Sequence, residues 1–366
     1  MKHLLNGCLL LLCVRLFGQE VGQTEWLFID ADRGDREIPC VVWYPAEDDG
    51  VTPAAGEFPT FVMAHGFVMS PLDYEGLAAA LVSEGYVFTS LGTEEGFAPS
   101  HADYGLDLAF VADRIAAAEV SGLLSASSNG RVAIGGHSMG GGAAWLAAAE
   151  QPAIDAVVVF APAETNPSAI AAGEEITVPV LVVSGADDAV TPPTTQHEPI
   201  YASAVNAPCR AFVSIAGGGH CGFADPGTLC DFGELGFQGL SHAEQLALSV
   251  SVVVPWLDAF LRDDPSGLDG VEQAASVGGL ELTLSCALTV EAQESEALEV
   301  FYQNPPTGLT LLNTTNQPIQ ATLWSAQGRK VLDHTLEPAM RWTPQVPSGV
   351  YVVTSGGAFA RKVIVQ

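Results

Sequence analysis

The sequence predicts an α/β fold with a mostly parallel sheet and helices on both faces, followed by a small C-terminal β-sandwich. From about residue 25 to residue 262, short β-branched and apolar runs alternate with longer segments of helical periodicity, a pattern typical of a sheet covered on both faces. Beyond residue 300, five short alternating runs are separated by Asn, Gly and Pro turns, as in a small sandwich.

Composition supports two domains and excludes some functions. The chain has 366 residues, 48% of them hydrophobic and 15% charged, which suits a large buried sheet. There are 43 Asp and Glu residues against 13 Lys and Arg, and such a surface repels phosphate backbones and anionic lipid. Nucleic acid is therefore excluded as a partner. We interpret the acidity as a solvated surface and expect a monomer.

The N-terminus predicts export. Residues 1–18 fit a signal peptide, with Lys2 before a short apolar run at residues 4–14 and Gly18 at the expected cleavage site. No later stretch reaches about 20 uninterrupted apolar residues, so no membrane span is predicted. The mature protein is expected to be secreted, either extracellular or at the cell surface.

The catalytic domain is predicted at residues 19–290, and it begins with antiparallel strands before the β-α alternation becomes regular. The predicted strands are residues 25–30, 39–44, 59–64, 86–91, 131–135, 156–161, 178–185 and 210–215. The predicted helices are residues 73–84, 103–120, 139–150 and 243–262. In the last helix Trp256 and Phe260 stand four residues apart, on one face that we expect to be buried.

An acidic linker is predicted at residues 291–300, and a β-sandwich at residues 301–366. This stretch contains the segments Asn304-Pro305, Ala326-Gln327-Gly328-Arg329, Pro347-Ser348-Gly349-Val350-Tyr351 and Arg361-Lys362-Val363. In these segments it resembles the sorting domain of the type IX secretion system of Bacteroidetes. This resemblance implies the type IX secretion machinery as a partner. A carbohydrate-binding or packing module is the alternative.

The sharpest chemical signal is Gly136-His137-Ser138-Met139-Gly140, between a predicted strand and a predicted helix. A serine in this context sits on a tight, strained turn, because the flanking glycines let the strand and the helix approach closely. The turn exposes the Ser138 hydroxyl at a helix N-terminus, whose partial positive charge favours a developing oxyanion. Ser138 is therefore the predicted nucleophile.

A serine nucleophile needs a base and a carboxylate that orients the base. The strand at residues 178–185 is followed by Asp187 and Asp188, at the sheet edge where active sites of open α/β folds form. We choose Asp188 as the acid and interpret Asp187 as a turn residue. The next strand ends in a glycine run that leads to His220, the predicted base. His197 and His242 are worse candidates, because they lie away from a strand end.

Acyl transfer also needs backbone N–H donors for the oxyanion. We assign these donors to Met139, which follows the nucleophile, and to Phe67, in the loop after the strand at residues 59–64. The Phe67 ring is expected to form one wall of the substrate cleft, unless it is a buried core aromatic. His137 and Met139 are also expected to line the substrate-binding site. For His65 we favour a structural role in this loop.

Residues 24–265 resemble the bacterial cutinase and polyester-hydrolase branch of the dienelactone-hydrolase-like α/β hydrolases. The resemblance lies in the elbow residues 136–142, in Asp188-Ala189-Val190-Thr191-Pro192 and in the spacing from Ser138 to Asp188 to His220. It implies an α/β-hydrolase fold, a secreted serine carboxylic ester hydrolase with a Ser-His-Asp triad and an acyl-enzyme, and an ester or polyester substrate. It also implies Asp188 rather than Asp187 as the acid.

The sequence departs from this branch at two places. Polyester hydrolases of the branch usually carry a Trp in the loop after the strand that follows the elbow helix, whereas residues 161–167 here contain no aromatic residue. The segment after His220 also differs and is interpreted as a bridged lid. Alternatives therefore stay open: an esterase for small or lipid esters without polyester activity, an amidase or peptidase, and a non-catalytic surface binding protein.

Five cysteines follow the predicted cleavage site, in a compartment where disulfides persist. Cys221 and Cys230 are close in sequence and flank a loop rich in Gly and Pro, so we predict that they pair. The pairing of Cys40, Cys209 and Cys286 stays open. We predict no metal site and no cofactor, since neither zinc-type spacing nor a calcium loop is present.

Overall fold

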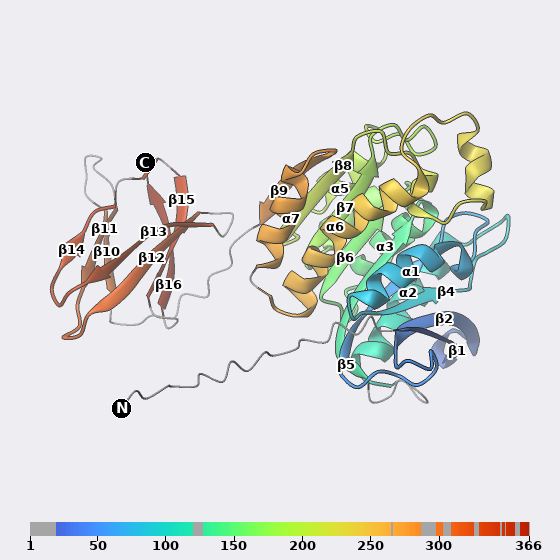
Figure 1. Cartoon of the computed structure of the whole chain (residues 1–366), viewed down its shortest axis with the longest axis horizontal. Helices are drawn as coiled ribbons and strands as arrows, with labels where there is room; N and C mark the ends of the chain where they lie inside the picture. The colour runs from blue at the N-terminus through green and yellow to red at the C-terminus, as the bar shows by residue number, and fades with distance from the viewer. Residues whose placement is uncertain are drawn as a thin grey trace, which may run out of the picture.

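A computed structural model describes most of the chain, and Figure 1 gives its course. The described residues are 20–119, 127–264, 266–286, 298–302, 309–325, 329–344, 346–347, 349–355 and 359–365. The predicted signal peptide and most of the predicted linker lie outside the described residues.

The part of the chain up to residue 286 contains a nine-stranded sheet with the order β1-β2-β4-β3-β5-β6-β7-β8-β9. Its strands are β1 (Glu20–Asp30), β2 (Arg36–Ala46), β3 (Phe58–Ala64), β4 (Val87–Leu91), β5 (Ser128–His137), β6 (Ala156–Phe160), β7 (Val180–Gly185), β8 (Cys209–Ile215) and β9 (Leu280–Cys286). Strands β4, β3, β5, β6, β7 and β8 are parallel, while β1, β2 and β9 pair antiparallel with their neighbours. The α/β prediction, with antiparallel strands at the start, is confirmed.

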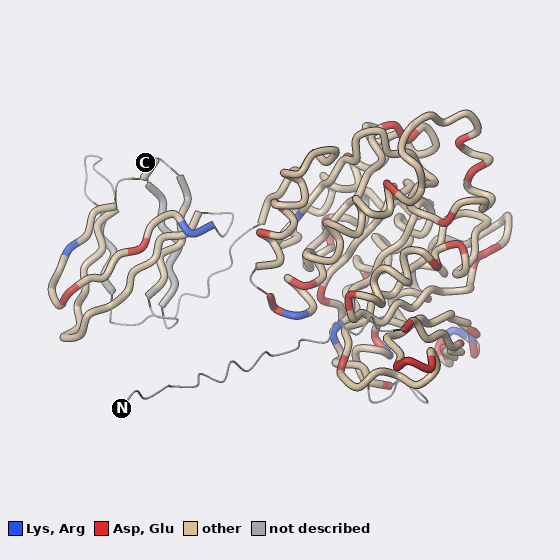
Figure 2. The backbone as a smooth tube through the Cα atoms, in the orientation of Figure 1, with Lys and Arg blue, Asp and Glu red and all other residues tan. Residues whose placement is uncertain are grey.

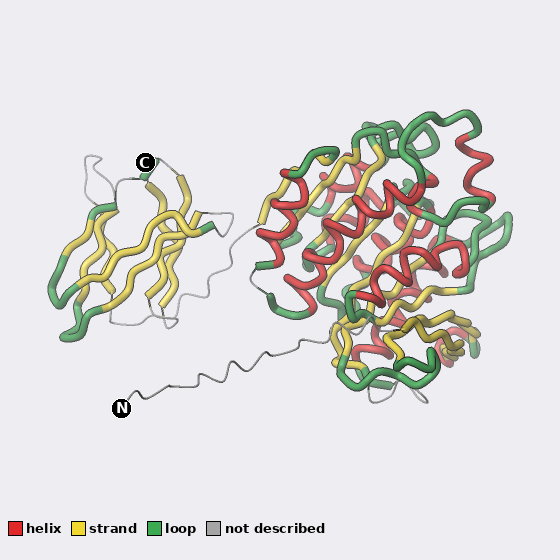
Figure 3. Tube along the Cα trace, viewed as in Figure 1, coloured by secondary structure: helices red, strands yellow, loops and turns green. Residues whose placement is uncertain are grey.

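Helices cover both faces of this sheet (Figures 1 and 3). They are α1 (Glu75–Ser83), α2 (His101–Ala116), α3 (Met139–Ala149), α4 (Ala169–Ala172), α5 (His197–Ser203), α6 (His242–Leu261) and α7 (Gly267–Ser276). One apolar core contains residues of α2, α3 and α5, and a second core contains residues of α1, α6 and α7. The four predicted helices are present. The short α4 and α5, together with α7 and β9, were not predicted.

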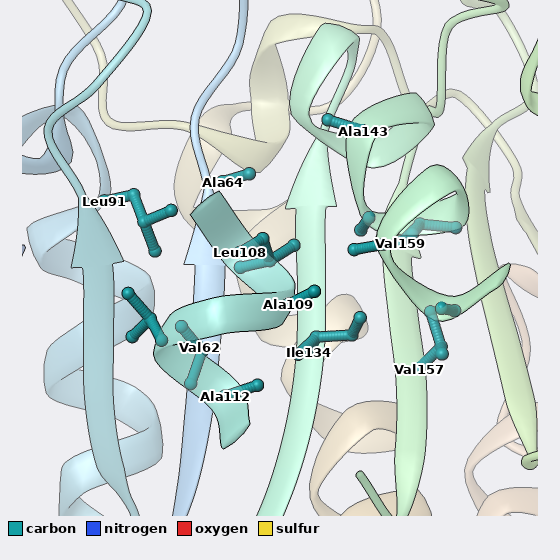
Figure 4. Packing of buried hydrophobic residues seen from close by; sticks show 14 of the residues in the cluster. Val62, Ala64, Leu91, Leu108, Ala109, Ala112, Ile134, Ala143, Val157 and Val159 are labelled. Carbon is teal, nitrogen blue, oxygen red and sulfur yellow. The ribbon is translucent and has the colours of Figure 1, made fainter. Parts of the chain in front are cut away.

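Alternation along the parallel strands builds the first core (Figure 4). Val62 of β3, Ile134 of β5 and Val157 of β6 are fully buried on the same face of the sheet. Ala109 and Ala112 of α2 lie against these strands, and their short side chains let the helix approach closely. This packing fixes α2 and α3 against the sheet, and α3 is the helix that follows the predicted nucleophile.

The C-terminal strands form two antiparallel sheets, β10-β11-β14 and β13-β12-β15-β16. The strands are β10 (Leu298–Tyr302), β11 (Leu309–Asn313), β12 (Ile319–Ser325), β13 (Lys330–Leu336), β14 (Arg341–Trp342), β15 (Gly349–Ser355) and β16 (Phe359–Val365). Leu309, Leu311, Leu323 and Val353 share one buried cluster, as expected for a small sandwich. β10 begins inside the predicted linker. Asn304-Pro305 and residues 326–328 lie outside the described residues.

Within the described part of the chain, α6 is the one helix long and apolar enough to be a membrane-span candidate. A capping box of Ser241 and Glu244 begins this helix, and Val252, Trp256 and Leu257 pack in the second core. A long apolar helix can also be a core helix of a globular domain. The packing of α6 in the second core explains its apolar composition. In Figure 2, Asp and Glu residues are scattered along the described chain, and Lys and Arg residues are few.

A buried carboxylate on α2 binds arginines of β2 and of the connection between β1 and β2. Asp107 of α2 has a fully buried side chain, and Arg36 of β2 donates to both of its oxygens, at 2.7 and 2.6 Å. Arg33 lies 2.7 Å from the same carboxylate. The bidentate geometry gives each donor a charged acceptor in a poorly hydrated position.

Replacing Asp107 with Asn should lower the free energy of unfolding by about 2 kcal/mol, because two arginines lose their shared buried counter-charge and keep only Asp30 and Glu94 as charged partners. Urea unfolding followed by tryptophan fluorescence measures this difference. Asp48→Asn, at an exposed position of the β2–β3 connection, is the matched control and should have little effect. Equal stability of the two variants would contradict the structural role of Asp107.

Candidate active site

Ser138 lies on the turn between β5 and α3, as predicted. Its φ of 55° and ψ of −119° place it in a backbone region that non-glycine residues rarely adopt. The turn is possible because its neighbours lack side chains: a Cβ on Gly136 would lie 2.2 Å from the Gly140 carbonyl oxygen, and one on Gly140 would lie 2.1 Å from that of Ala64. Ser138 as a whole residue is 9% exposed.

Asp188 follows β7 and is held by its own loop. One carboxylate oxygen accepts the N–H groups of Val190 and Thr191, both at 2.8 Å, and the other accepts from His220 Nδ1 at 2.7 Å. Burial acts to raise the pKa of Asp188, but the hydrogen bond and charge of His220 outweigh it and leave the pKa below its ordinary value. The neighbouring Asp187 is exposed.

His220 lies at the end of the loop after β8, and the side chain is 3% exposed. A carboxylate can only accept a hydrogen bond, so Nδ1 carries the proton shared with Asp188 and Nε2 is left free to accept one. The structure therefore brings together the predicted base and the predicted acid, from loops 32 residues apart.

The nucleophile and the base are less directly joined. No hydrogen bond between the Ser138 hydroxyl and the His220 ring is present among the described residues. Their segments nevertheless touch, because His137 Nε2 donates to the His220 carbonyl oxygen at 3.0 Å and the centroids of the two rings lie 4.7 Å apart. Catalytic hydrogen bonds are often long without substrate and tighten when it binds.

The residues predicted to form the oxyanion hole lie on two segments that meet. Met139 begins α3, and the close approach of Gly140 to the Ala64 carbonyl places this helix start against the loop that carries Phe67. Among the described residues, the N–H groups of Phe67 and Met139 have no hydrogen-bond acceptor. Two unpaired N–H groups on adjoining segments are what an oxyanion site requires.

Phe67 is half exposed and not a core aromatic, whereas Met139 is 4% exposed. The Phe67 ring packs edge-on against Phe97, with centroids 6.4 Å apart, and Phe97 is 83% exposed. Two exposed rings in contact form an apolar surface beside the predicted oxyanion loop.

His137 is fully buried, and both of its ring nitrogens are engaged within the protein. Since Nε2 donates to the His220 carbonyl, Nδ1 must accept, and the Tyr74 hydroxyl donates to it at 2.9 Å. Burial holds the pKa of His137 well below its ordinary value. His137 thus supports the loop between β8 and η4 (Cys221–Phe223), residues 216–220, which ends in His220 and is here called the base loop. Direct contact of His137 with substrate stays a prediction.

The backbone around His220 is held by side chains that sequence analysis did not single out. Gln245 of α6 binds both the N–H and the carbonyl of Gly219, each at 2.8 Å. Glu234 accepts the N–H of His220 at 2.6 Å and that of Cys221 at 2.8 Å. These partners lie 13 to 26 residues farther along the chain, and no local pattern marks them.

His197, a worse candidate for the base by its position along the sequence, is a fully buried neighbour of the acid. Its Nε2 is 3.6 Å from the Asp188 carboxylate and 2.9 Å from the Thr191 hydroxyl, which also lies 2.9 Å from His220 Nδ1. The other ring nitrogen is bonded to the Ser184 hydroxyl at 2.8 Å. His197 does lie away from a strand end, at the start of α5, and this short helix packs against β7 and so brings the ring to the acid.

Two disulfides are present among the described cysteines. The predicted Cys221–Cys230 bond is confirmed. A second bond joins Cys209 of β8 to Cys286 of β9, and Cys40 is free and buried. His137, His220 and Cys230 place potential metal-ligating atoms within 4.8 Å. However, the Cys230 sulfur is in a disulfide and both His137 nitrogens are engaged, so these residues do not fit a metal ion.

Burial lowers the pKa of His197 from 6.5 to about 4. Between these values the unfolded chain binds more protons than the folded one, so stability falls as the pH falls from about 6.5 toward 4. His197→Asn should remove about 3 kcal/mol of this acid-dependent loss, from roughly 1.4 kcal/mol per pKa unit. Unfolding free energies at a series of pH values measure the difference. The same pH slope in both proteins would contradict a neutral buried ring.

Comparison with known proteins identifies the family. The family described as PET hydrolase-like matches residues 40–235, more than half of the chain, including Ser138, Asp188 and His220. Similar proteins include a bis(hydroxyethyl) terephthalate hydrolase of Streptomyces coelicolor, 26% identical over 179 residues that cover 49% of this chain and 54% of that protein. Cutinase est1 of Thermobifida alba is 31% identical over 90 residues, 25% of this chain and 29% of its own length.

Cutinase 1 of Thermobifida cellulosilytica is 30% identical over 90 residues, which cover 25% of this chain and 33% of that protein. The chain thus matches about half the length of the bis(hydroxyethyl) terephthalate hydrolase and about a third of the length of each of the two cutinases. The match by family covers the whole sheet edge from β3 to the loop after β8, where the predicted site residues lie. The chain belongs to the PET hydrolase-like family.

Proposed function

We propose that this chain is a secreted serine carboxylic ester hydrolase in which Ser138 is the nucleophile, His220 the base and Asp188 the orienting acid. The observation that carries the proposal is the buried 2.7 Å hydrogen bond between His220 and Asp188, beside a strained serine turn. Family membership favours the same reaction class.

The chemistry follows from the proton positions. His220 Nε2 takes the proton of the Ser138 hydroxyl as the oxygen attacks the ester carbonyl carbon, and the N–H groups of Phe67 and Met139 stabilise the oxyanion. Collapse of this intermediate breaks the ester C–O bond, and the alcohol leaves with the proton from His220. Water, deprotonated by His220, then attacks the acyl-enzyme and releases the acid and free Ser138. Asp188 stabilises the imidazolium at each stage.

Export is part of the proposal. The predicted signal peptide at residues 1–18 and the resemblance of the C-terminal sandwich to a type IX sorting domain favour secretion. The two disulfides favour an oxidising compartment.

Ser138→Ala should lower kcat for p-nitrophenyl butyrate at least about a thousandfold, because the acyl-enzyme cannot form. Release of p-nitrophenolate by the purified protein measures this loss. Ser83→Ala, at an exposed serine of α1, is the matched control and should keep wild-type activity. If wild type and Ser138→Ala were equally inactive, a non-catalytic binding protein would be favoured instead. Cleavage of amides but not esters would favour an amidase or peptidase.

We propose polyesters as one substrate class, and small or lipid esters as the second candidate. Membership of the PET hydrolase-like family and the exposed rings of Phe67 and Phe97 favour polyesters. The loop after β6 favours the second candidate. Ala163 donates to the Ser138 carbonyl oxygen at 2.8 Å, so this loop borders the nucleophile, and residues 161–167 carry no aromatic ring.

Films of an aliphatic and an aromatic polyester distinguish these candidates. We expect soluble product from the aliphatic film, detected by chromatography, and none with Ser138→Ala. The aromatic film should react more slowly, because one stacking wall is missing from the loop after β6. An enzyme that hydrolyses p-nitrophenyl butyrate but releases nothing from either film would be a small-ester hydrolase.

A further inference from the structure

Gly219 and His220 at the end of the base loop, and Cys221 directly after it, have almost all of their backbone groups bonded to side chains. Gln245 holds both groups of Gly219, His137 holds the carbonyl of His220, and Glu234 holds the N–H groups of His220 and Cys221. The Cys221 carbonyl accepts from the backbone of Ala224 at 3.0 Å. The peptide planes on both sides of His220 are therefore fixed from outside the loop.

Glu234 differs from the other two partners in its setting. Gln245 and His137 are fully buried on α6 and β5, whereas Glu234 is part-buried and ends η5 (Leu229–Glu234), a 3-10 helix beyond the base loop. The Cys221–Cys230 disulfide ties η5 to η4 (Cys221–Phe223), the 3-10 helix that follows His220. The carboxylate thus reaches the base from a segment that is covalently attached beside it.

The fit of this carboxylate against the loop is close. A Cβ on Gly219 would lie 2.6 Å from Glu234 Oε1 and 2.8 Å from the Phe237 ring, so a side chain at residue 219 would displace the segment. At 2.6 and 2.8 Å, the two hydrogen bonds have the short distances of charge-assisted bonds. Each carboxylate oxygen serves one N–H, so the two bonds fix the direction of consecutive peptide groups.

We infer that Glu234 is a positioning residue for His220: its carboxylate clamps the N–H groups on both sides of the base's α-carbon and so aims the imidazole. The inference rests on the proposed function, in which His220 is the base. The side chain of His220 has only two rotatable bonds, and the bond to Asp188 restrains one end of the ring. With the backbone also fixed, Nε2 has one direction relative to Ser138.

Loss of this clamp should affect the chemical step more than binding. A displacement of about 1 Å in a reacting group can cost on the order of 100-fold in rate. Both Glu234 oxygens bind backbone N–H groups of the protein, so we expect this residue to contribute little to ground-state binding of the ester. The disulfide would keep η5 attached, so the fold should survive the loss of the carboxylate.

The experiment compares Glu234→Ala, Glu234→Gln and Ser138→Ala with wild type. The matched control is Glu150→Ala. Glu150 is exposed at the end of α3, and its substitution removes the same charge as Glu234→Ala. Kinetics with p-nitrophenyl butyrate give kcat and KM separately, and thermal unfolding checks that each variant is folded. Glu234→Ala should lower kcat by about 10- to 100-fold with KM within about twofold. Glu234→Gln, which keeps one acceptor oxygen, should lie between it and wild type.

The outcomes separate the two proposals. If wild type is active, Ser138→Ala is inactive and folded Glu234→Ala keeps wild-type kcat, this inference alone is overturned. A rise in KM with unchanged kcat overturns it as well, because Glu234 would then act in binding. If Glu234→Ala does not fold, a Glu234→Gln protein with wild-type kcat overturns it. An active Ser138→Ala overturns the proposed function and this inference with it.

Discussion

The buried hydrogen bond between Asp188 and His220 is the interaction on which the site depends. It joins two loops that follow neighbouring parallel strands, so it exists only if β7 and β8 are adjacent and end at the same edge of the sheet. The same edge carries Ser138 after β5 and the loop of Phe67 after β3. A parallel sheet thus brings side chains from distant parts of the sequence together at one edge.

Around this bond, buried polar side chains are hydrogen-bonded to one another. Thr191 stands between Asp188, His197 and His220, and Tyr74 joins Gly66 to His137 through its hydroxyl. Each group gains a partner in a region where an unsatisfied group would be costly. Rigidity at the sheet edge therefore comes from side chains on several elements, while the strands provide only the framework.

Sequence analysis predicted the parts of the site that have local signatures. The glycines around Ser138 mark a sterically demanding turn, and Asp188 and His220 each follow an apolar strand. It could not find Glu234, Gln245 or His197, because these residues act through contacts set by tertiary structure.

β9 was missed for a related reason: its alternating side chains are only half buried, and its place beside β8 is set by pairing and by the Cys209–Cys286 bond. Only a three-dimensional arrangement reveals such partners.

Cys40 has a consequence for how the oxidised protein is assembled. It is a free thiol in the first core, on β2 between β1 and β4, while the other four described cysteines form disulfides around β8 and the base loop. Burial raises the pKa of its thiol far above the ordinary value, so thiolate, the species that attacks disulfides, is essentially absent in the native state. Once the first core is formed, Cys40 therefore cannot take part in thiol–disulfide exchange, and the two disulfides are protected from rearrangement.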